Sequence, residues 1–346
     1  MDNLTNLEAI KKIDPQNTVG STDLLIEQLQ TAWSQVHALP IQPLKDIEMI
    51  VFCGMGASIY GALVVKALVG SQFKYPSEII TDYHLPSYVN ERTLVILTSY
   101  SGTTEEVLSC AQEAKEKKAK MLILTKGGQL AAFAKEHTIP AYIFDGALNL
   151  SSTPRLGAGY TILGLIGLLN KSGIVTIPEQ ELEHAITKLQ SQVEIIKQQA
   201  MSDAKALKGK LPVVIAAEHL SGNAQILRNQ FNETSKTFSA SYLVPDLNHH
   251  LMEGLQFPQP SNLHFLLLQS HHYSEKISKR MQLTADVIKQ NKQIVQEYVP
   301  TAHTIYGDFL ETLTYGGYLT LYLGLLYDQN PAINPWVDYF KEQLKR

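Results

Sequence analysis

Residues 47–58 read IEMIVFCGMGAS, and residues 93–104 read TLVILTSYSGTT. In each stretch, a run of apolar and β-branched residues typical of a buried strand leads into a turn of glycine or hydroxyl residues, and a helical pattern follows. A strand that passes through a short turn into a helix is the repeating unit of a parallel sheet with helices on both faces. The two stretches therefore predict an α/β fold.

The same alternation of short apolar runs and longer helical patterns continues through the first half of the chain. The expected strands are residues 47–53, 78–80, 93–98, 120–124 and 140–144. The expected helices are residues 58–69, 103–117, 129–136 and 158–169. Together they predict one doubly wound domain over residues 1–175.

Beyond Pro178 the chain becomes charged and then repeats the first pattern. The periodic segment 179–208 predicts a long amphipathic helix, so we expect residues 176–208 to connect two domains. Later strands are expected at residues 211–217, 263–269 and 293–298, and helices at 223–235, 274–289 and 307–326. Since 346 residues suffice for two cores, residues 209–346 are expected to form a second α/β domain.

Composition excludes several classes of partner. The formal net charge is -4, the pI is about 6.3 and no block of Lys or Arg stands out, so we expect neither nucleic acid nor an anionic membrane as partner. The first residues contain no apolar signal core, and no apolar stretch is long enough to span a bilayer, which predicts a cytoplasmic protein. The two cysteines, Cys53 and Cys110, have no metal-like spacing and are expected to be buried.

The turns at residues 54–58 and 99–104 indicate a ligand-binding site. Both follow strands of a predicted parallel sheet, and ligands of such sheets bind at the carboxyl ends of the strands. Glycines let a ligand approach the backbone, the helix start offers N–H groups with partial positive charge, and hydroxyls add donors, all of which suit a phosphate. The expected substrate-binding residues of the turns are Gly56, Ala57, Ser58, Ser99, Ser101 and Thr104.

Two other interpretations apply to these turns. Ser or Thr followed by Glu105 and Glu106 also resembles a helix-capping signature. Capping explains one hydroxyl but not four within six residues, so phosphate binding is favoured and capping is expected in addition. A dinucleotide fingerprint needs a further glycine where Ile59 stands, so a nicotinamide cofactor is not expected.

The second turn resembles the Ser-x-Ser-Gly-x-Thr loop of the SIS (sugar isomerase) domain. Three further stretches resemble the bifunctional phosphoglucose/phosphomannose isomerase family, in the order found there: PRLGAGY at 154–160, RNQFNETSK at 228–236 and VPDLNHHLMEG at 244–254. The resemblance runs from about residue 14 to the C-terminus. It implies two SIS-type three-layer αβα domains, each with a central mainly parallel sheet, and a homodimer whose active site is shared between subunits.

Three positions depart from the pattern of that family. Ala57 stands where the family has the second glycine of Gly-Met-Gly-Gly-Ser, so a methyl group is added close to the expected ligand. Asp246 replaces the usual glutamate, and His250 replaces the usual asparagine beside His249.

The resemblance implies an aldose–ketose isomerase. Such a reaction moves a proton between C1 and C2 through a cis-enediolate, and it needs one base that accepts the proton and returns it. A carboxylate suits this task, and the motif match places it on Glu233. The alternative for Glu233 is a surface glutamate paired with Lys236 at three-residue spacing.

Three other residues are expected to complete the site. His249 suits ring opening, because histidine titrates near neutrality. Metal binding through His249, His250 and Glu253 is not expected, since adjacent side chains point in different directions. Arg155 suits stabilisation of the enediolate, with a phosphate or structural carboxylate as its alternative partner. Lys341, in the expected terminal helix 335–344, matches a family lysine that binds substrate; otherwise it is a solvated charge.

The sequence as a whole predicts interconversion of glucose 6-phosphate, mannose 6-phosphate or both with fructose 6-phosphate, without a cofactor or metal. A non-catalytic phosphosugar-sensing SIS protein is the main alternative, and it would bind the phosphosugar without turnover. An amino-sugar phosphate isomerase is a third interpretation, and an assay with glucosamine 6-phosphate as substrate would test it.

Overall fold

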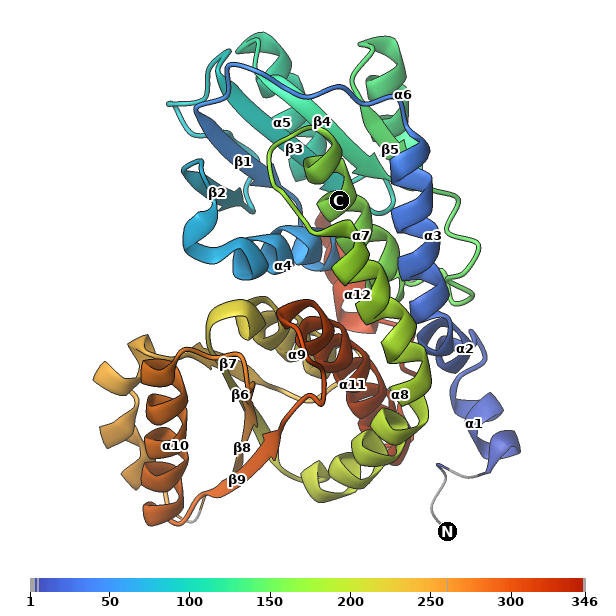
Figure 1. Ribbon diagram of the computed structural model, residues 1–346. Helices are drawn as coiled ribbons and strands as arrows, with labels where there is room; N and C mark the ends of the chain where they lie inside the picture. Colours follow the sequence, from blue (N-terminus) through green and yellow to red (C-terminus); the bar gives the residue numbers. More distant parts are fainter. Residues whose placement is uncertain (1–3, 5, 260, 345–346) are drawn as a thin grey trace.

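The chain forms two lobes, each built on a parallel sheet with helices on both faces (Figure 1). The computed structural model describes residues 4, 6–259 and 261–344. In both sheets the carboxyl ends of the strands point toward the middle of the molecule (Figure 1). The expected α/β class is therefore confirmed, and the two ligand-binding edges face the region between the lobes.

The first sheet has five parallel strands in the order β2-β1-β3-β4-β5. They are β1 (Met49–Cys53), β2 (Ser77–Ile80), β3 (Thr93–Ser99), β4 (Lys120–Thr125) and β5 (Ala141–Ile143). Alternate side chains enter different cores: Ile50 and Phe52 pack in the core on one face of the sheet, whereas Val51 and Cys53 pack in the core on the other face. Because both faces are covered, the central strands β1 and β3 are almost completely buried.

The helices of this lobe are α1 (Leu7–Ile13), α2 (Thr18–Asp23), α3 (Leu25–Ala38), α4 (Tyr60–Val69), α5 (Glu105–Glu116), α6 (Gly128–Glu136) and α7 (Ala158–Lys171). The short 3₁₀ helices are η2 (Gly56–Ile59), η3 (Gly70–Gln72) and η4 (Pro154–Gly157). The sequence did not predict α1, α2 and α3, although α3 carries an apolar face with Leu29 and Val36 fully buried.

The second sheet has four parallel strands in the order β7-β6-β8-β9. They are β6 (Leu211–Ala216), β7 (Ala240–Leu243), β8 (Leu263–Leu268) and β9 (Ile294–Tyr298). The helices are α8 (Glu179–Leu207), α9 (Ser221–Glu233), α10 (Glu275–Gln290), α11 (Ile305–Leu326) and α12 (Pro335–Leu344), with 3₁₀ helices η5 (Glu218–Leu220), η6 (Asp246–His249) and η7 (Met252–Gln256). None of the helices within the described residues is long and apolar enough to cross a membrane.

Helices α9 and α11 lie on one side of the second sheet and α10 lies on the other (Figure 1). The long helix α8 occupies the segment that was expected to connect the domains, and it packs along α11. Strand β7 was not predicted. It is a short edge strand whose four residues are all only partly buried, so its sequence lacks the apolar run that marked the other strands.

The lobes are joined by helix α4, which packs against both α7 and α9. Glycines permit this close approach: a Cβ atom on Gly61 would lie 2.6 Å from the carbonyl oxygen of Thr161, and one on Gly222 would lie 2.7 Å from that of Leu63. Helix α4 starts directly after the first glycine turn. The packing therefore brings that turn close to α9, which ends at Glu233.

Candidate active site

The turn between β1 and α4 is compact and touches the turn after β3. Gly56 has a φ of +55°, a conformation that favours glycine, and it opens η2. Ala57 and Ser58 are buried within η2. The hydroxyl of Ser58 accepts a hydrogen bond from the backbone N–H of Tyr100 at 3.1 Å, which ties the two turns together.

The turn after β3 is held by its own hydroxyl groups. The hydroxyls of Ser99 and Thr104 lie 2.7 Å apart, and Ser99 also accepts from the N–H of Gly102 at 3.0 Å. Gly102 has a φ of +72°, and a Cβ atom there would lie 1.8 Å from the carbonyl oxygen of Gly127. Only glycine fits at this position, so the shape of the turn depends on it.

The start of helix α5 is left open toward the turn. Thr104 is the N-cap residue of α5, but its side chain makes no capping hydrogen bond, because its hydroxyl pairs with Ser99. The expectation that this turn also caps the helix is therefore wrong. The N–H groups of the first helical turn remain free of a side-chain cap at Thr104, an arrangement that favours an anion.

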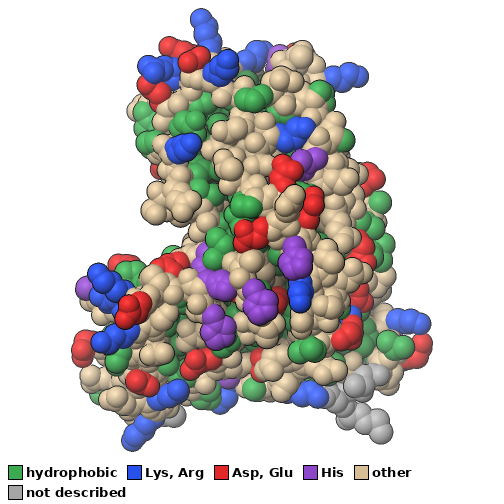
Figure 2. All heavy atoms as spheres, viewed as in Figure 1, with side chains coloured by type: hydrophobic (Ala, Val, Ile, Leu, Met, Phe, Trp, Pro, Cys, Tyr) green, Lys and Arg blue, Asp and Glu red, His purple; other side chains and the backbone are tan. Residues whose placement is uncertain are grey.

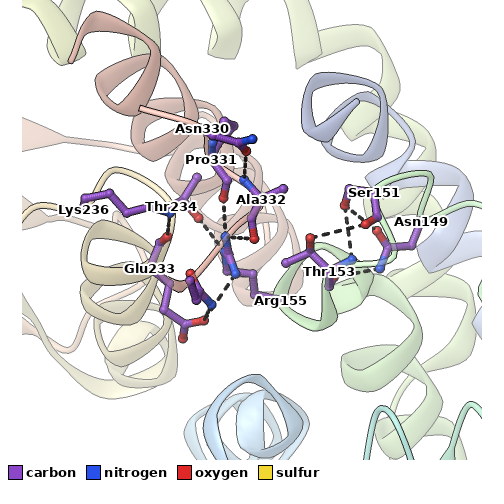
Figure 3. Close-up of polar contacts among 11 residues, drawn as sticks. Asn149, Ser151, Thr153, Arg155, Glu233, Thr234, Lys236, Asn330, Pro331 and Ala332 are labelled. Carbon is purple, nitrogen blue, oxygen red and sulfur yellow. Dashed lines mark hydrogen bonds and ion pairs between the residues drawn. The ribbon is translucent and has the colours of Figure 1, made fainter. Parts of the chain in front are cut away.

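Arg155 lies in η4 and links three segments of the chain (Figure 3). Its Nε donates to the hydroxyl of Thr234 at 3.0 Å, and its NH1 donates to Oε2 of Glu233 at 3.4 Å. Its NH2 donates to the carbonyl oxygens of Pro331 and Ala332, the latter at 3.1 Å. The predicted residues Arg155 and Glu233 are thus brought together from different lobes.

The guanidinium of Arg155 is almost completely buried, at 2% exposure. Burial lowers the pKa of Arg155, whereas Glu233 and Tyr60 raise it; an arginine still stays charged at any ordinary pH. Arginine has five N–H donors, and the contacts to Thr234, Glu233, Pro331 and Ala332 use four of them. The remaining N–H belongs to NH1, the nitrogen beside Glu233.

The carboxylate of Glu233 is half-buried at the end of α9 and faces Arg155. Its Oε2 accepts from Arg155 and also from the side-chain amide of Asn334, at 3.3 Å. Its Oε1 accepts no hydrogen bond from any residue that the structure describes. Sequence reasoning missed Asn334, since a single asparagine in the loop before α12 carries no motif that could have marked it.

The alternative pairing of Glu233 with Lys236 is not formed. The ammonium of Lys236 donates instead to the backbone carbonyl of Glu233 at 2.5 Å, and Lys236 has a φ of +55°. Burial, followed by the nearby charge of Arg155, lowers the pKa of Lys236 to about 8. The carboxylate is therefore left to Arg155 and Asn334.

Tyr60, the first residue of α4, is a second side chain that sequence reasoning missed. It is fully buried, and its hydroxyl makes no hydrogen bond of normal geometry with a described residue. Burial and then the negative charge of Glu233 raise the pKa of Tyr60 above its ordinary value. Tyr60 thus follows the first glycine turn and lies within the electrostatic field of Glu233.

His249 and Lys341 are not brought to this cluster within one chain. His249 lies exposed in η6, where the neighbouring His250 pairs with Asp246 at 3.5 Å. Lys341 lies exposed on α12. No hydrogen bond or ion pair between described residues joins either of them to Arg155 or Glu233, and no group of three His, Cys, Asp or Glu among those residues is placed to hold a metal.

The space-filling view shows a deep notch between the two lobes, on the side where β2 and β7 lie (Figure 2). Histidine side chains gather near its inner end (Figure 2). At the meeting point of the lobes, η2 packs against β3, η4 and α9. The turns, Arg155 and Glu233 therefore converge on one region.

Both halves of the chain match known family models. Residues 44–143 match the SIS domain, and residues 196–344 match the bacterial phospho-glucose isomerase C-terminal SIS domain. These matches confirm the expectation of two SIS domains.

Whole proteins are similar as well. A bifunctional phosphoglucose/phosphomannose isomerase of Caldicellulosiruptor bescii is 28% identical over 334 residues, 92% of this chain and 96% of that protein. A protein of the same name from Aquifex aeolicus is 30% identical, over 92% of this chain and 95% of that protein. The crystal structure of a hypothetical protein from Thermus thermophilus matches with a TM-score of 0.70 at 17% identity, covering 98% of this chain and 93% of that one, a likeness of fold.

Proposed function

Because this chain belongs to the bifunctional phosphoglucose/phosphomannose isomerase family, we propose that it interconverts glucose 6-phosphate, mannose 6-phosphate or both with fructose 6-phosphate. The family expected from the sequence motifs is confirmed. One observation carries the proposal furthest: the carboxylate of Glu233 lies 3.4 Å from the buried guanidinium of Arg155.

Glu233 is the base in the proposed reaction. It removes the proton from C2 of the open-chain aldose, the C–H electron pair forms the C1=C2 double bond, and negative charge develops on O1. A proton then passes from the O2 hydroxyl to O1, Glu233 returns its proton to C1, and the carbonyl forms at C2. One carboxylate both accepts and returns the proton, so no cofactor is needed.

Arg155 stabilises the enediolate in this proposal. Its fixed positive charge lies in a buried place, where a preorganised cation stabilises developing negative charge more strongly than it would in water. The N–H of NH1 that is not engaged by the chain is the donor available to a substrate oxygen. The neighbouring contacts to Thr234, Pro331 and Ala332 hold the guanidinium in place.

The phosphate of the substrate is proposed to bind the turns 54–58 and 99–104. The hydroxyl of Ser101 is exposed, the start of α5 has no side-chain cap, and Ser58 ties the turns together. These features support Gly56, Ala57, Ser58, Ser99, Ser101 and Thr104 as the substrate-binding residues proposed from the sequence.

A homodimer with a shared active site would account for His249 and Lys341. Both side chains are exposed and lie apart from Glu233 in the polar contacts of a single chain. Helix α12, which carries Lys341, exposes large apolar side chains: Trp336 is 83% exposed and Phe340 is 60% exposed. An exposed apolar helix face of this kind is typical of an interaction site. We propose that His249 opens the sugar ring and that Lys341 binds substrate across this interface.

A coupled assay with purified protein tests the proposed function. Fructose 6-phosphate should form from glucose 6-phosphate, mannose 6-phosphate or both. If neither aldose gives fructose 6-phosphate at high enzyme concentration, the proposal is contradicted. Thermal stabilisation by these phosphosugars without turnover would indicate a sensor, and turnover of glucosamine 6-phosphate alone would indicate an amino-sugar enzyme.

A further inference from the structure

The two oxygens of the Glu233 carboxylate are in different environments. Oε2 accepts one hydrogen bond from Arg155 at 3.4 Å and a second from Asn334 at 3.3 Å. Oε1 accepts none from the described part of the chain. The last torsion of a glutamate is broad and roughly two-fold, so nothing in the side chain itself distinguishes the two oxygens. The protein around Glu233 makes that distinction.

Asn334 is the last residue of the segment 330–334, here called the strap, which forms the end of the connection from α11 to α12. Arg155 binds the strap through the carbonyl oxygens of Pro331 and Ala332. The side chain of Asn330 accepts from the N–H of Ala332 at 2.9 Å and donates to Gln16 at 2.9 Å. The strap is therefore fixed before it reaches Asn334, whose amide is presented to the carboxylate.

We propose that Asn334 is a positioning residue for the isomerase reaction. Together with Arg155 it holds Oε2 of Glu233 in place. Oε1 is then the oxygen that carries the proton between C2 and C1. The inference rests on the proposed role of Glu233 as the base. The inference adds Asn334 as a supporting residue and names Oε1 as the reacting oxygen of Glu233. The amide of Asn334 acts through Glu233 and does not touch the reacting carbons.

Two physical effects follow from this contact. An amide that donates to a carboxylate fixes the plane of the carboxylate, and a base must hold its plane to meet the C–H bond at close range. The amide of Asn334 also donates to the ionised carboxylate, which is the form that can accept a proton. Arg155 alone would leave the carboxylate with one donor at Oε2.

The contact predicts a particular pattern in the kinetics of Asn334→Ala and of the isosteric Asn334→Asp. Loss of the amide should lower kcat by about 10- to 100-fold, the effect of removing one hydrogen bond to a charged group. KM should change by no more than about twofold, because uniform substrate binding is untouched. The acid limb of the pH–rate profile should move to higher pH, and further for Asn334→Asp, whose negative charge faces Glu233.

Asn330→Ala is the matched control. Asn330 lies in the same strap and is partly buried like Asn334, but it makes no contact with Glu233 among the described residues. If Asn334 only stabilised the strap, both alanine variants would behave alike. We expect the acid limb to move in the Asn334 variants and to move much less in Asn330→Ala, in which Arg155 still holds the strap through Pro331 and Ala332. An unmoved acid limb in an active Asn334→Asp would overturn the inference.

A second measurement needs no turnover and separates this inference from the proposed function. The side-chain amide signals of Asn334 in an NMR spectrum, assigned by their loss in Asn334→Ala, should shift with pH in the wild type and stop shifting in Glu233→Gln. If the Asn334 signals of the wild type do not shift with pH, the contact between Asn334 and Glu233 is contradicted, even if the protein has isomerase activity. A wild type without isomerase activity but with pH-sensitive signals would instead contradict the proposed function, and the contact would stand.

Discussion

Arg155 determines the geometry of the site through its contacts with two other segments of the chain. Its guanidinium donates to Glu233 and Thr234 at the end of α9 and to the strap, so one buried side chain holds together parts of the protein that are far apart in sequence. Lysine could not do this, because its ammonium lacks the flat fork of five donors. The carboxylate that we propose as the base is therefore held by a cation from the other lobe.

Lys236 gives the protein a distinctive dependence of stability on pH. Its pKa is lowered from 10.5 to about 8 in the folded chain, so the folded state binds fewer protons than the unfolded state between these values. Stability then rises with pH across that window, since the cost of burying the charged ammonium disappears as it loses its proton. Below pH 8 the full cost is present.

Chemical denaturation at pH 7, 8, 9 and 10 checks this for Lys236→Met. The free energy of unfolding of the wild type should rise relative to that of the variant between about pH 8 and 10. A difference that is constant over this range, or that falls, would contradict the lowered pKa. Because the side chain is partly exposed, the change should be modest.

Among the elements, the two turns proposed to bind the phosphate lead from strand to helix and leave their helix starts without a side-chain cap. Neither η2 nor α5 has a side-chain capping hydrogen bond at its N-cap residue. Hydroxyls that cap helices in other proteins are here paired with one another, as in Ser99 with Thr104. Their pairing shapes the turn and leaves backbone donors for a ligand.

Ser101→Ala tests this interpretation of the turn. Ser101 is exposed and its hydroxyl contacts the neighbouring Thr103, so its loss should leave the melting temperature nearly unchanged. A hydrogen bond to a charged group contributes about 1.5–3 kcal/mol, so the KM for a phosphosugar should rise about tenfold or more. Ser71→Ala, at another exposed serine, is the control and should behave like the wild type. An unchanged KM in Ser101→Ala would remove this hydroxyl from the phosphate site.

The sequence predicted most elements that are apolar or carry a motif, with the amphipathic helix α3 as an exception, and it missed those defined by tertiary contacts. Strands such as β3 contain a continuous apolar run, and the turn that follows β3 is recognisable in the sequence by its glycine and hydroxyl residues. The edge strand β7 is partly exposed throughout, so its pairing with β6 could not be predicted from its pattern. Asn334 and Tyr60 gain their importance only because folding brings them to Glu233.

At the scale of the whole molecule, the site depends on the packing of the two lobes. The first lobe supplies the turns and Arg155, and the second supplies Glu233 and the strap. Helix α4 fixes their relation through its contacts with α7 and α9. His249 and Lys341 lie outside this arrangement, which is why we propose that they act at an interface with a second copy.

Mixing two inactive variants tests the shared site. Glu233→Gln and His249→Ala should each be inactive alone. If a site combines Glu233 of one subunit with His249 of the other, random reassembly of a two-fold dimer restores about a quarter of the wild-type activity. Mixtures that remain inactive after subunit exchange, which a mass measurement of mixed dimers can verify, would contradict the sharing.

We propose that Glu233 carries the proton between C1 and C2, and exchange of that proton with solvent reports on this transfer. With phosphosugar in D₂O, the wild type should place deuterium on the sugar carbons as isomerisation proceeds, which NMR detects. Glu233→Gln should still bind the phosphosugar, since the turns 54–58 and 99–104 are untouched, but it should incorporate no deuterium. Incorporation of deuterium by Glu233→Gln at a rate near that of the wild type would contradict the role of Glu233 as the base.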